Sequence, residues 1–137
     1  MDIYAENILD HHRHPRHKQA LSDATVEHAE ANLSCGDELT VRLKIENDRV
    51  TGIGWEGTGC AISQAGMSIL SEDLIGRMTA EIDGLRKSDI YTLLGVPIGP
   101  RRFKCALLCL HTLKNAVRKF TGQPPQDWLQ TVELTEN

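Results

Sequence analysis

The chain has 137 residues, of which 40% are hydrophobic and 25% charged, and its formal net charge is −4. This length fits one domain, residues 1–137, with a hydrophobic core that needs no disulfide support. The slight acidity argues against nucleic-acid binding, which requires a concentrated basic surface. No apolar run approaches the roughly 20 residues that span a bilayer, and the acidic start MDIYAENILD is unlike a signal peptide. We therefore expect a cytoplasmic protein.

Residues 2–14 are predicted to form a helix with one apolar side, which ends at Pro15. This region carries a cluster of four histidines: His11, His12, His14 and His17. Sequence spacing alone does not bring their rings together. We therefore interpret them as solvated residues around a helix end and a proline turn, rather than as metal ligands.

The chain then changes to strand patterns. Residues 39–45 alternate apolar and polar side chains, which is the period expected where one face of a sheet is buried. Asn47 and Asp48 predict a turn, and residues 50–55 return as the next strand. Residues 25–33 are interpreted as a third strand. The first half is thus a helix followed by an antiparallel meander.

The second half is predicted to be helical. The glycine-rich turn at residues 57–59 leads into a helix from residue 60 or 61 to residue 75. A second helix is expected at residues 79–94, followed by a loop at residues 95–100. In the last helix, apolar residues recur at intervals of four, three and four: Ala106, Leu110, Leu113 and Val117. The segment after Gly122 is expected to dock loosely. Helices segregated from an antiparallel sheet predict an α+β fold, with the helical C-terminal half packed on the three-stranded sheet.

Three of the four cysteines lie at the ends of predicted elements. Cys35 precedes the alternating strand, Cys60 opens a helix after a glycine-rich turn, and Cys105 lies in the first turn of the last helix. A helix N-terminus favours thiolate over thiol, and the cations of Arg102 and Lys104, together with Arg101, act in the same direction at Cys105. Thiolates bind soft metals and attack sulfur atoms.

Each cysteine taken alone could be a small buried apolar residue. Cys109 lies nearer the apolar stripe of the last helix than Cys105 does, so we interpret it as a core residue. The alternative is a second thiol, one turn from Cys105, that serves as a resolving group or another ligand. His111 does not share a helix face with Cys105 and is interpreted as structural or solvated. Three cysteines at element ends favour one convergent site.

Four segments carry a resemblance to a known family: YAENILDHHRHPRH, SCGDELTVRLKI, WEGTGCAISQAGMSIL and GPRRFKCALLCLHTLKNAV. They resemble, in the same order, the opening helix and the three cysteine regions of the iron–sulfur cluster assembly scaffold family. This family contains IscU, SufU and the amino-terminal domain of NifU. The resemblance runs from about residue 4 to residue 119.

The resemblance implies an α+β fold and a ligand set made of Cys35, Asp37, Cys60 and Cys105. It implies a cysteine desulfurase as the sulfur donor, and either a transient [2Fe–2S] cluster or Zn²⁺ at the site. One function is a scaffold that transfers its cluster to apo iron–sulfur acceptor proteins. The other is a zinc-dependent sulfur acceptor, with Cys105 as the residue that receives sulfur. A binding module with a structural zinc is the alternative of another class. Assembly into a homo-oligomer is left open.

The branch of the family is less defined. Lys104 stands where the IscU branch has a histidine before its third cysteine, and only Pro100 is present of that branch's Leu-Pro-Pro-Val-Lys chaperone motif. The segment PRRFKC is more similar to the SufU branch. However, the chain lacks the insertion that SufU proteins carry between their second and third cysteines.

Overall fold

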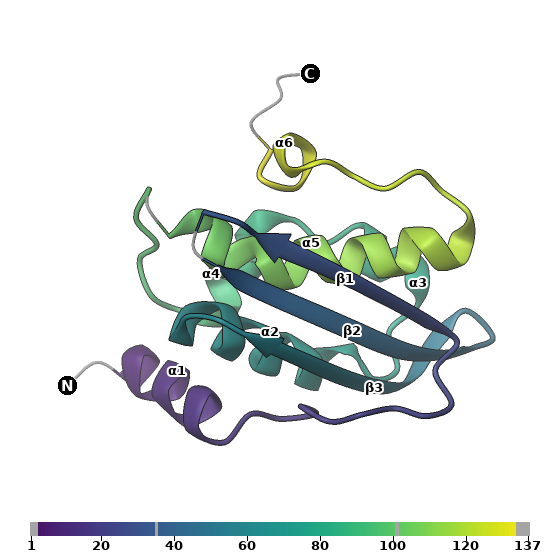
Figure 1. Ribbon diagram of the computed structural model, residues 1–137, viewed down its shortest axis with the longest axis horizontal. Helices are drawn as coiled ribbons and strands as arrows, with labels where there is room; N and C mark the ends of the chain where they lie inside the picture. Colours follow the sequence, from purple (N-terminus) through teal and green to yellow (C-terminus); the bar gives the residue numbers. More distant parts are fainter. Residues whose placement is uncertain (1–2, 35, 101, 134–137) are drawn as a thin grey trace.

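The computed structural model describes residues 3–34, 36–100 and 102–133 (Figure 1). The elements follow one another along the chain as α1 (Ile3–Arg13), β1 (Val26–Asn32), β2 (Asp37–Glu46), β3 (Arg49–Thr58), α2 (Ala61–Leu74), α3 (Thr79–Asp83), α4 (Lys87–Leu94), α5 (Phe103–Thr121) and α6 (Trp128–Thr131). The predicted α+β class, with a first helix, three antiparallel strands and a helical second half, is confirmed. No helix within the described ranges is long and apolar enough to cross a membrane.

The sheet has the order β1-β2-β3, and both strand pairs are antiparallel. Val41 on the central strand lies opposite His28 on β1 and Trp55 on β3. The predicted turn between β2 and β3 is confirmed, because Asn47 and Asp48 adopt φ values of 51° and 59°. A two-residue hairpin turn with positive φ at both positions matches the twist of the strands that it joins.

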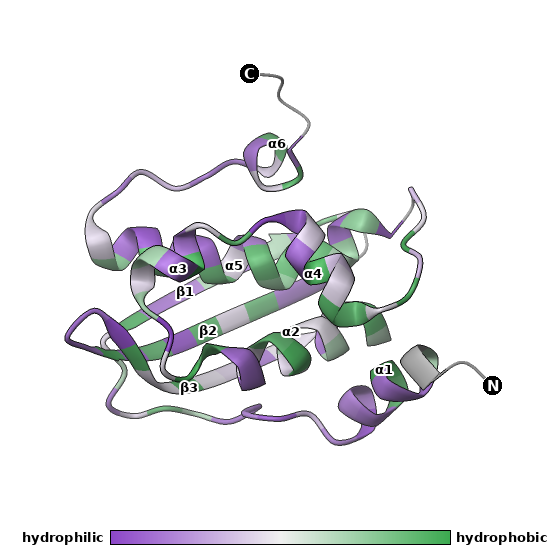
Figure 2. Ribbon diagram, turned by 180° about the vertical axis from the view of Figure 1, so that it is seen from behind, coloured by the Kyte–Doolittle hydropathy of each residue, from purple (hydrophilic) through white to green (hydrophobic). Residues whose placement is uncertain are grey.

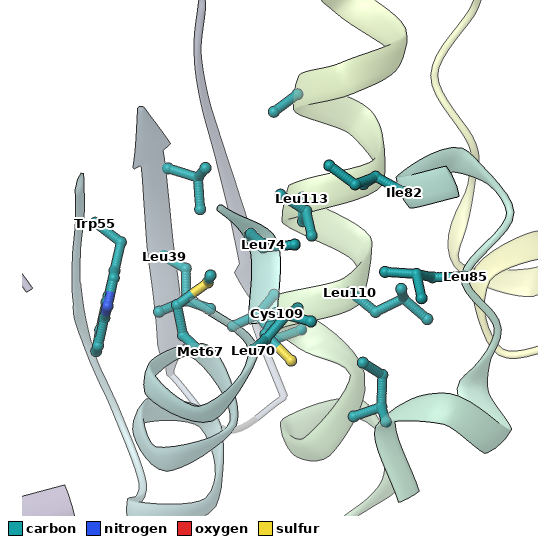
Figure 3. Packing of buried hydrophobic residues seen from close by; sticks show 14 of the residues in the cluster. Leu39, Trp55, Met67, Leu70, Leu74, Ile82, Leu85, Cys109, Leu110 and Leu113 are labelled. Atoms are coloured by element: carbon teal, nitrogen blue, oxygen red, sulfur yellow. The ribbon is translucent and has the colours of Figure 1, made fainter. Parts of the chain in front are cut away.

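The helices α2 and α5 cover one face of the sheet, and the other face is turned away from them (Figure 1). Figure 2 shows how hydrophobic and hydrophilic residues alternate along β2, so that only one set of its side chains enters the core. The apolar residues of β2 and β3 meet those of α2 and α5 in one cluster (Figure 3). Labelled members of this cluster include Leu39, Trp55, Met67, Leu70, Cys109, Leu110 and Leu113. The interpretation of Cys109 as a core residue is confirmed, since its side chain is fully buried.

The prediction of one helix over residues 79–94 is wrong. Gly84 ends α3, and the carboxylate of Asp89 accepts a hydrogen bond from the backbone N–H of Arg86 at 2.8 Å, which starts α4 as a new helix. Between the two helices, the ammonium of Lys114 on α5 donates to the carbonyl oxygen of Leu85 at 2.8 Å. A buried cation thus satisfies a carbonyl that the break leaves outside a helix, and burial lowers the pKa of Lys114.

The segment after Gly122, which we expected to dock loosely, makes specific contacts with α5. The side chain of Asn115 donates to the carbonyl of Gln126 and accepts from its N–H, over 3.1 and 2.8 Å. The ring of Trp128 stacks on His111 with 4.2 Å between centroids. Thr131 is buried and lies with its hydroxyl 2.7 Å from Nδ1 of His111.

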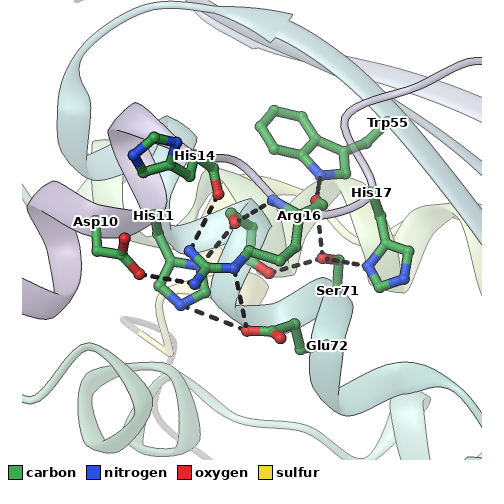
Figure 4. Close-up of polar contacts among 9 residues, drawn as sticks. Asp10, His11, His14, Arg16, His17, Trp55, Ser71 and Glu72 are labelled. Atoms are coloured by element: carbon green, nitrogen blue, oxygen red, sulfur yellow. Dashed lines mark hydrogen bonds and ion pairs between the residues drawn. The ribbon is translucent and has the colours of Figure 1, made fainter.

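The histidines of the first helix do not share one environment. His12 and His14 are exposed as expected, but the expectation is wrong for His11, which is only 5% exposed. Its Nδ1 lies 2.7 Å from Oγ of Ser68, and its Nε2 lies 3.4 Å from a carboxylate oxygen of Glu72 (Figure 4). Burial and the nearby guanidinium of Arg16 lower the pKa of His11. These contacts hold α1 and the segment after it against α2.

Candidate metal centre

Three of the four residues proposed as ligands converge in space. Asp37 is the first residue of β2, Cys60 immediately precedes α2, and Cys105 is the third residue of α5. One carboxylate oxygen and the two sulfur atoms all lie within 4.8 Å of one another. Cys35, the fourth predicted ligand, lies outside the described residues. The topology explains this convergence, since the start of the central strand lies at the same end of the sheet as the N-termini of both covering helices (Figure 1).

The carboxylate of Asp37 is buried, and only one of its two oxygens has a hydrogen-bond partner among the described residues. Its Oδ1 accepts a hydrogen bond from the backbone N–H of Cys60 at 2.8 Å. Its Oδ2 has no hydrogen-bond partner among the described residues, and it is shielded from solvent because Asp37 is only 1% exposed. An unpaired buried carboxylate oxygen costs free energy. A cation between this oxygen and the two sulfurs would remove that cost, so the residues present fit a metal.

Gly59 makes the close approach of Asp37 possible. Its φ of +142° lies in the region that favours glycine, and a Cβ at this position would collide with Oδ1 of Asp37. The glycine therefore gives the carboxylate room to reach the N–H of Cys60. The predicted glycine-rich turn thus lies beside the candidate site and leaves space for the carboxylate of Asp37.

Two helix N-termini meet at the site. Cys60 is the N-cap residue of α2 but makes no capping hydrogen bond with its side chain. Cys105 lies in the first turn of α5, a helix of 19 residues. The N–H groups of a first helical turn have no partner within their helix and carry partial positive charge. Both helices therefore favour negative charge at the sulfurs, as expected from the sequence.

The three candidate ligands differ in their exposure. Asp37 and Cys105 are 1% and 4% exposed, whereas Cys60 is partly exposed. The site is thus covered on the side of β2 and α5 and accessible on the side of Cys60. A metal or cluster bound there could exchange with solvent or with a partner protein from one direction.

Cys109 and His111 are not members of this group. The thiol of Cys109 donates to the carbonyl oxygen of Ala106 at 3.4 Å, and full burial raises its pKa to about 12. His111 is confirmed as structural by its contacts with Thr131 and Trp128. Lys104, beside Cys105, places its ammonium 5.9 Å from the ring centroid of Trp128, within the usual range of a cation–π contact.

Asn32 is a neighbour of the site that the sequence did not reveal. Its side-chain amide donates to Sγ of Cys105 at 3.9 Å, and it is 3% exposed. The two residues are 73 positions apart in the chain. A polar residue at a strand end is ordinary, so no local pattern could have indicated this contact.

Two sulfurs and a carboxylate oxygen can hold zinc or iron. In a tetrahedral zinc site with Zn–S distances near 2.3 Å, ligand atoms are separated by roughly 3.8 Å. The ligand atoms here, all within 4.8 Å of one another, reach that geometry with small side-chain movements. Three ligands leave a fourth position for another residue or for an exchanging group.

Comparison with known proteins gives a consistent result. The model of the NifU-like N terminal domain family matches residues 3–127. The iron–sulfur cluster assembly scaffold protein IscU of Thermotoga maritima is 34% identical, in a match that covers 87% of this chain and 95% of that protein. The zinc-dependent sulfurtransferase SufU of Bacillus subtilis is 31% identical, in a match that covers 88% of this chain and 92% of that protein. Among solved structures, a protein assigned as a SUF-system scaffold from Fervidobacterium islandicum is similar, with a TM-score of 0.73, 28% identity and coverage of 82% and 94%.

Proposed function

Because the chain belongs to the NifU-like N terminal domain family, we propose that it is an iron–sulfur cluster assembly scaffold whose cargo is a labile [2Fe–2S] cluster. The observation that carries the proposal is the buried carboxylate of Asp37, which lies within 4.8 Å of the sulfurs of Cys60 and Cys105 and has one oxygen with no hydrogen-bond partner among the described residues. Thiolates are the usual ligands of such clusters.

Cys35 is the proposed fourth ligand. Only Gly36 separates it from Asp37 in the sequence, so one short segment would supply two ligands. The set of Cys35, Asp37, Cys60 and Cys105 would then give four protein ligands to a cluster that needs four.

The mixed ligand set suits a cluster that is made and then released. A carboxylate is a harder donor than a thiolate and is less suited to an iron–sulfur centre. Cys60 is partly exposed, so an acceptor protein can approach from that side. Asp37 would therefore hold the cluster weakly at one position, which permits transfer to apo iron–sulfur proteins.

A cysteine desulfurase is the proposed sulfur donor, and an electron-transfer protein or a thiol would supply the two electrons that convert each persulfide sulfur to sulfide. The positive ends of α2 and α5, together with Arg102 and Lys104, favour the approach of an anionic persulfide. Reduced cysteines at such a site are expected in the cytoplasm.

The test of this function is cluster transfer. The protein is reconstituted anaerobically with Fe²⁺ and sulfide and then mixed with the apo form of a [2Fe–2S] acceptor protein. We expect the acceptor to gain its cluster faster than it does from free Fe²⁺ and sulfide when a strong chelator is present. A transfer rate that falls to the free-ion rate under the chelator would contradict the proposal.

A second candidate function is a zinc-dependent sulfur acceptor, and the specific observation that favours it is Lys104 directly before Cys105. Here the thiolate of Cys105 attacks the terminal sulfur of the desulfurase persulfide. A new S–S bond forms on Cys105, the persulfide S–S bond breaks, and the desulfurase cysteine leaves as a thiolate. No net oxidation or reduction occurs in this step.

Mass spectrometry separates the two candidates. The zinc-loaded protein is incubated with desulfurase and cysteine, digested and mapped. Added sulfur on Cys105, or else on Cys35 or Cys60, with zinc retained and no cluster formed on reconstitution, supports the sulfur acceptor. A cluster that forms and transfers supports the scaffold.

A further inference from the structure

The last rung of the β1–β2 hairpin contacts both described cysteines of the site. Asn32 and Asp37 are register partners at this rung. The side chain of Asp37 accepts from the backbone N–H of Cys60 at 2.8 Å, while the side chain of Asn32 donates to Sγ of Cys105 at 3.9 Å. One pair of facing residues thus reaches the start of α2 and the start of α5.

We infer that Asn32 is a positioning residue of the metal site, whose amide N–H fixes the orientation of the Cys105 sulfur and lowers its donor strength. The inference rests on the proposed function, because it assumes that Cys105 binds the metal or cluster. It assigns a role to a residue that is not itself a ligand.

The burial of Asn32 argues that its polar side chain has a specific role. The side chain of Asn32 is 3% exposed, and a buried amide without a partner costs free energy. A cysteine sulfur is a weak hydrogen-bond acceptor, so this contact contributes little to the stability of the metal-free protein. The amide is therefore better explained by the sulfur that it faces than by stability.

The chemical effect has a defined direction. An N–H group that donates to a metal-bound thiolate withdraws electron density from the sulfur, and hydrogen bonds of this kind tune cluster reduction potentials and metal affinity. Both partners also lie on rigid elements, a paired strand end and a first helical turn. The contact therefore holds the sulfur in one direction while Asp37 holds the peptide of Cys60.

The test uses Asn32→Leu, which removes the donor at similar size, and Asn32→Ala as a second variant that avoids crowding. Asn115→Leu is the matched control, because Asn115 is a buried asparagine that also bridges α5 and β1, through Glu30, but is not in contact with the site. Zn²⁺ affinity is measured by chelator competition, and Co²⁺ is used as a spectroscopic probe.

We expect Asn32→Leu and Asn32→Ala to lose Zn²⁺ affinity by on the order of 10- to 100-fold, because the loss of the fixed sulfur orientation outweighs the gain in donor strength. The thiolate-to-Co²⁺ absorption band should move to longer wavelength in Asn32→Leu, because the sulfur becomes a stronger donor. Asn115→Leu should lower the melting temperature and leave the band unmoved.

An unmoved Co²⁺ band in both Asn32→Leu and Asn32→Ala, with Zn²⁺ affinity within twofold of the wild type, would overturn the inference. In that case, loss of metal in Cys105→Ser would leave the proposed function standing. Retention of metal in Cys105→Ser would instead remove Cys105 from the ligand set and overturn both.

Discussion

The carboxylate of Asp37 accepts a hydrogen bond from the backbone N–H of Cys60 at 2.8 Å, so one candidate ligand positions the peptide of another. This hydrogen bond joins the start of β2 to the N-cap of α2. Asp37 therefore has two separable roles, one through Oδ1, which accepts from the peptide, and one through Oδ2, which has no partner in the described part of the chain.

Substitution of Asp37 should separate these roles. We expect a bound cluster to decay more slowly in both Asp37→Ala and Asp37→Asn, because the weakest ligand position is where solvent and acceptors compete. Asp37→Asn keeps an acceptor for the N–H of Cys60, so it should also keep more thermal stability than Asp37→Ala. Cluster absorbance followed over time after anaerobic reconstitution measures the decay. Faster decay in Asp37→Asn would mean that the carboxylate is an essential holding ligand.

Gly59→Ala should damage the site more than an equivalent change elsewhere. A Cβ there collides with Oδ1 of Asp37 in addition to straining a positive φ, whereas Gly76 has a φ of +91° with open space around it. Both Gly59→Ala and the control Gly76→Ala should lower the free energy of unfolding, by about 1 kcal/mol or more. Only Gly59→Ala should also weaken Zn²⁺ binding. Equal Zn²⁺ affinity in the two variants would contradict the role given to Gly59.

Cys109 should be chemically inert in the folded protein. With its pKa raised to about 12 by burial, only about one molecule in ten thousand carries the thiolate at pH 8. Iodoacetamide applied to the metal-free protein should therefore label the partly exposed Cys60 long before Cys109, as peptide mapping can measure. Cys109→Ala should keep metal binding and cost stability through lost packing in the hydrophobic core. Early labelling of Cys109 would show that the core opens readily at this position.

Stability should fall as the pH drops below neutrality, in part through His11. Burial lowers the pKa of His11 below its unfolded value near 6.5, so between the two values the unfolded state binds more protons. The contribution of the neutral ring is complete above pH 6.5 and is lost as the pH falls through the folded pKa. Burial also lowers the pKa of His111, which adds to the same trend.

Urea unfolding at a series of pH values measures this dependence. His11→Gln should flatten the decline below pH 6.5 without abolishing it, because His111 still titrates. The control His12→Gln changes an exposed histidine one position along the same helix and should leave the decline unchanged. An identical pH dependence in the wild type and His11→Gln would contradict the assignment.

The features that could be predicted are those that depend on local sequence patterns. The alternation over residues 39–45 records which side of β2 faces the core, and the positive φ values of Asn47 and Asp48 follow from residue types that tolerate them. Cys60 and Cys105 were predicted to converge because both lie at the ends of predicted elements, and the family resemblance added Asp37 to the proposed ligand set. Their convergence with Asp37 follows from strand and helix order.

The features that could not be predicted depend on tertiary partners. His11 contacts Ser68, which lies 57 positions away in the chain, and Asn32 contacts Cys105 across 73 positions. The break at Gly84 was missed because glycine is tolerated within helices. The break leaves the carbonyl of Leu85 outside a helix, and this carbonyl accepts a hydrogen bond from Lys114, a residue of a different helix. No window of neighbouring residues contains such information.

The most direct test of the central claim is the metal content and visible absorption of protein purified and reconstituted without oxygen. The account predicts a [2Fe–2S] spectrum with about two irons and two sulfides per chain in the wild type and in Cys109→Ser, and its loss in Cys60→Ser and Cys105→Ser. Tightly held zinc, no cluster on reconstitution and no sulfur adduct after incubation with a desulfurase would contradict it. That result would leave a binding module with a structural zinc.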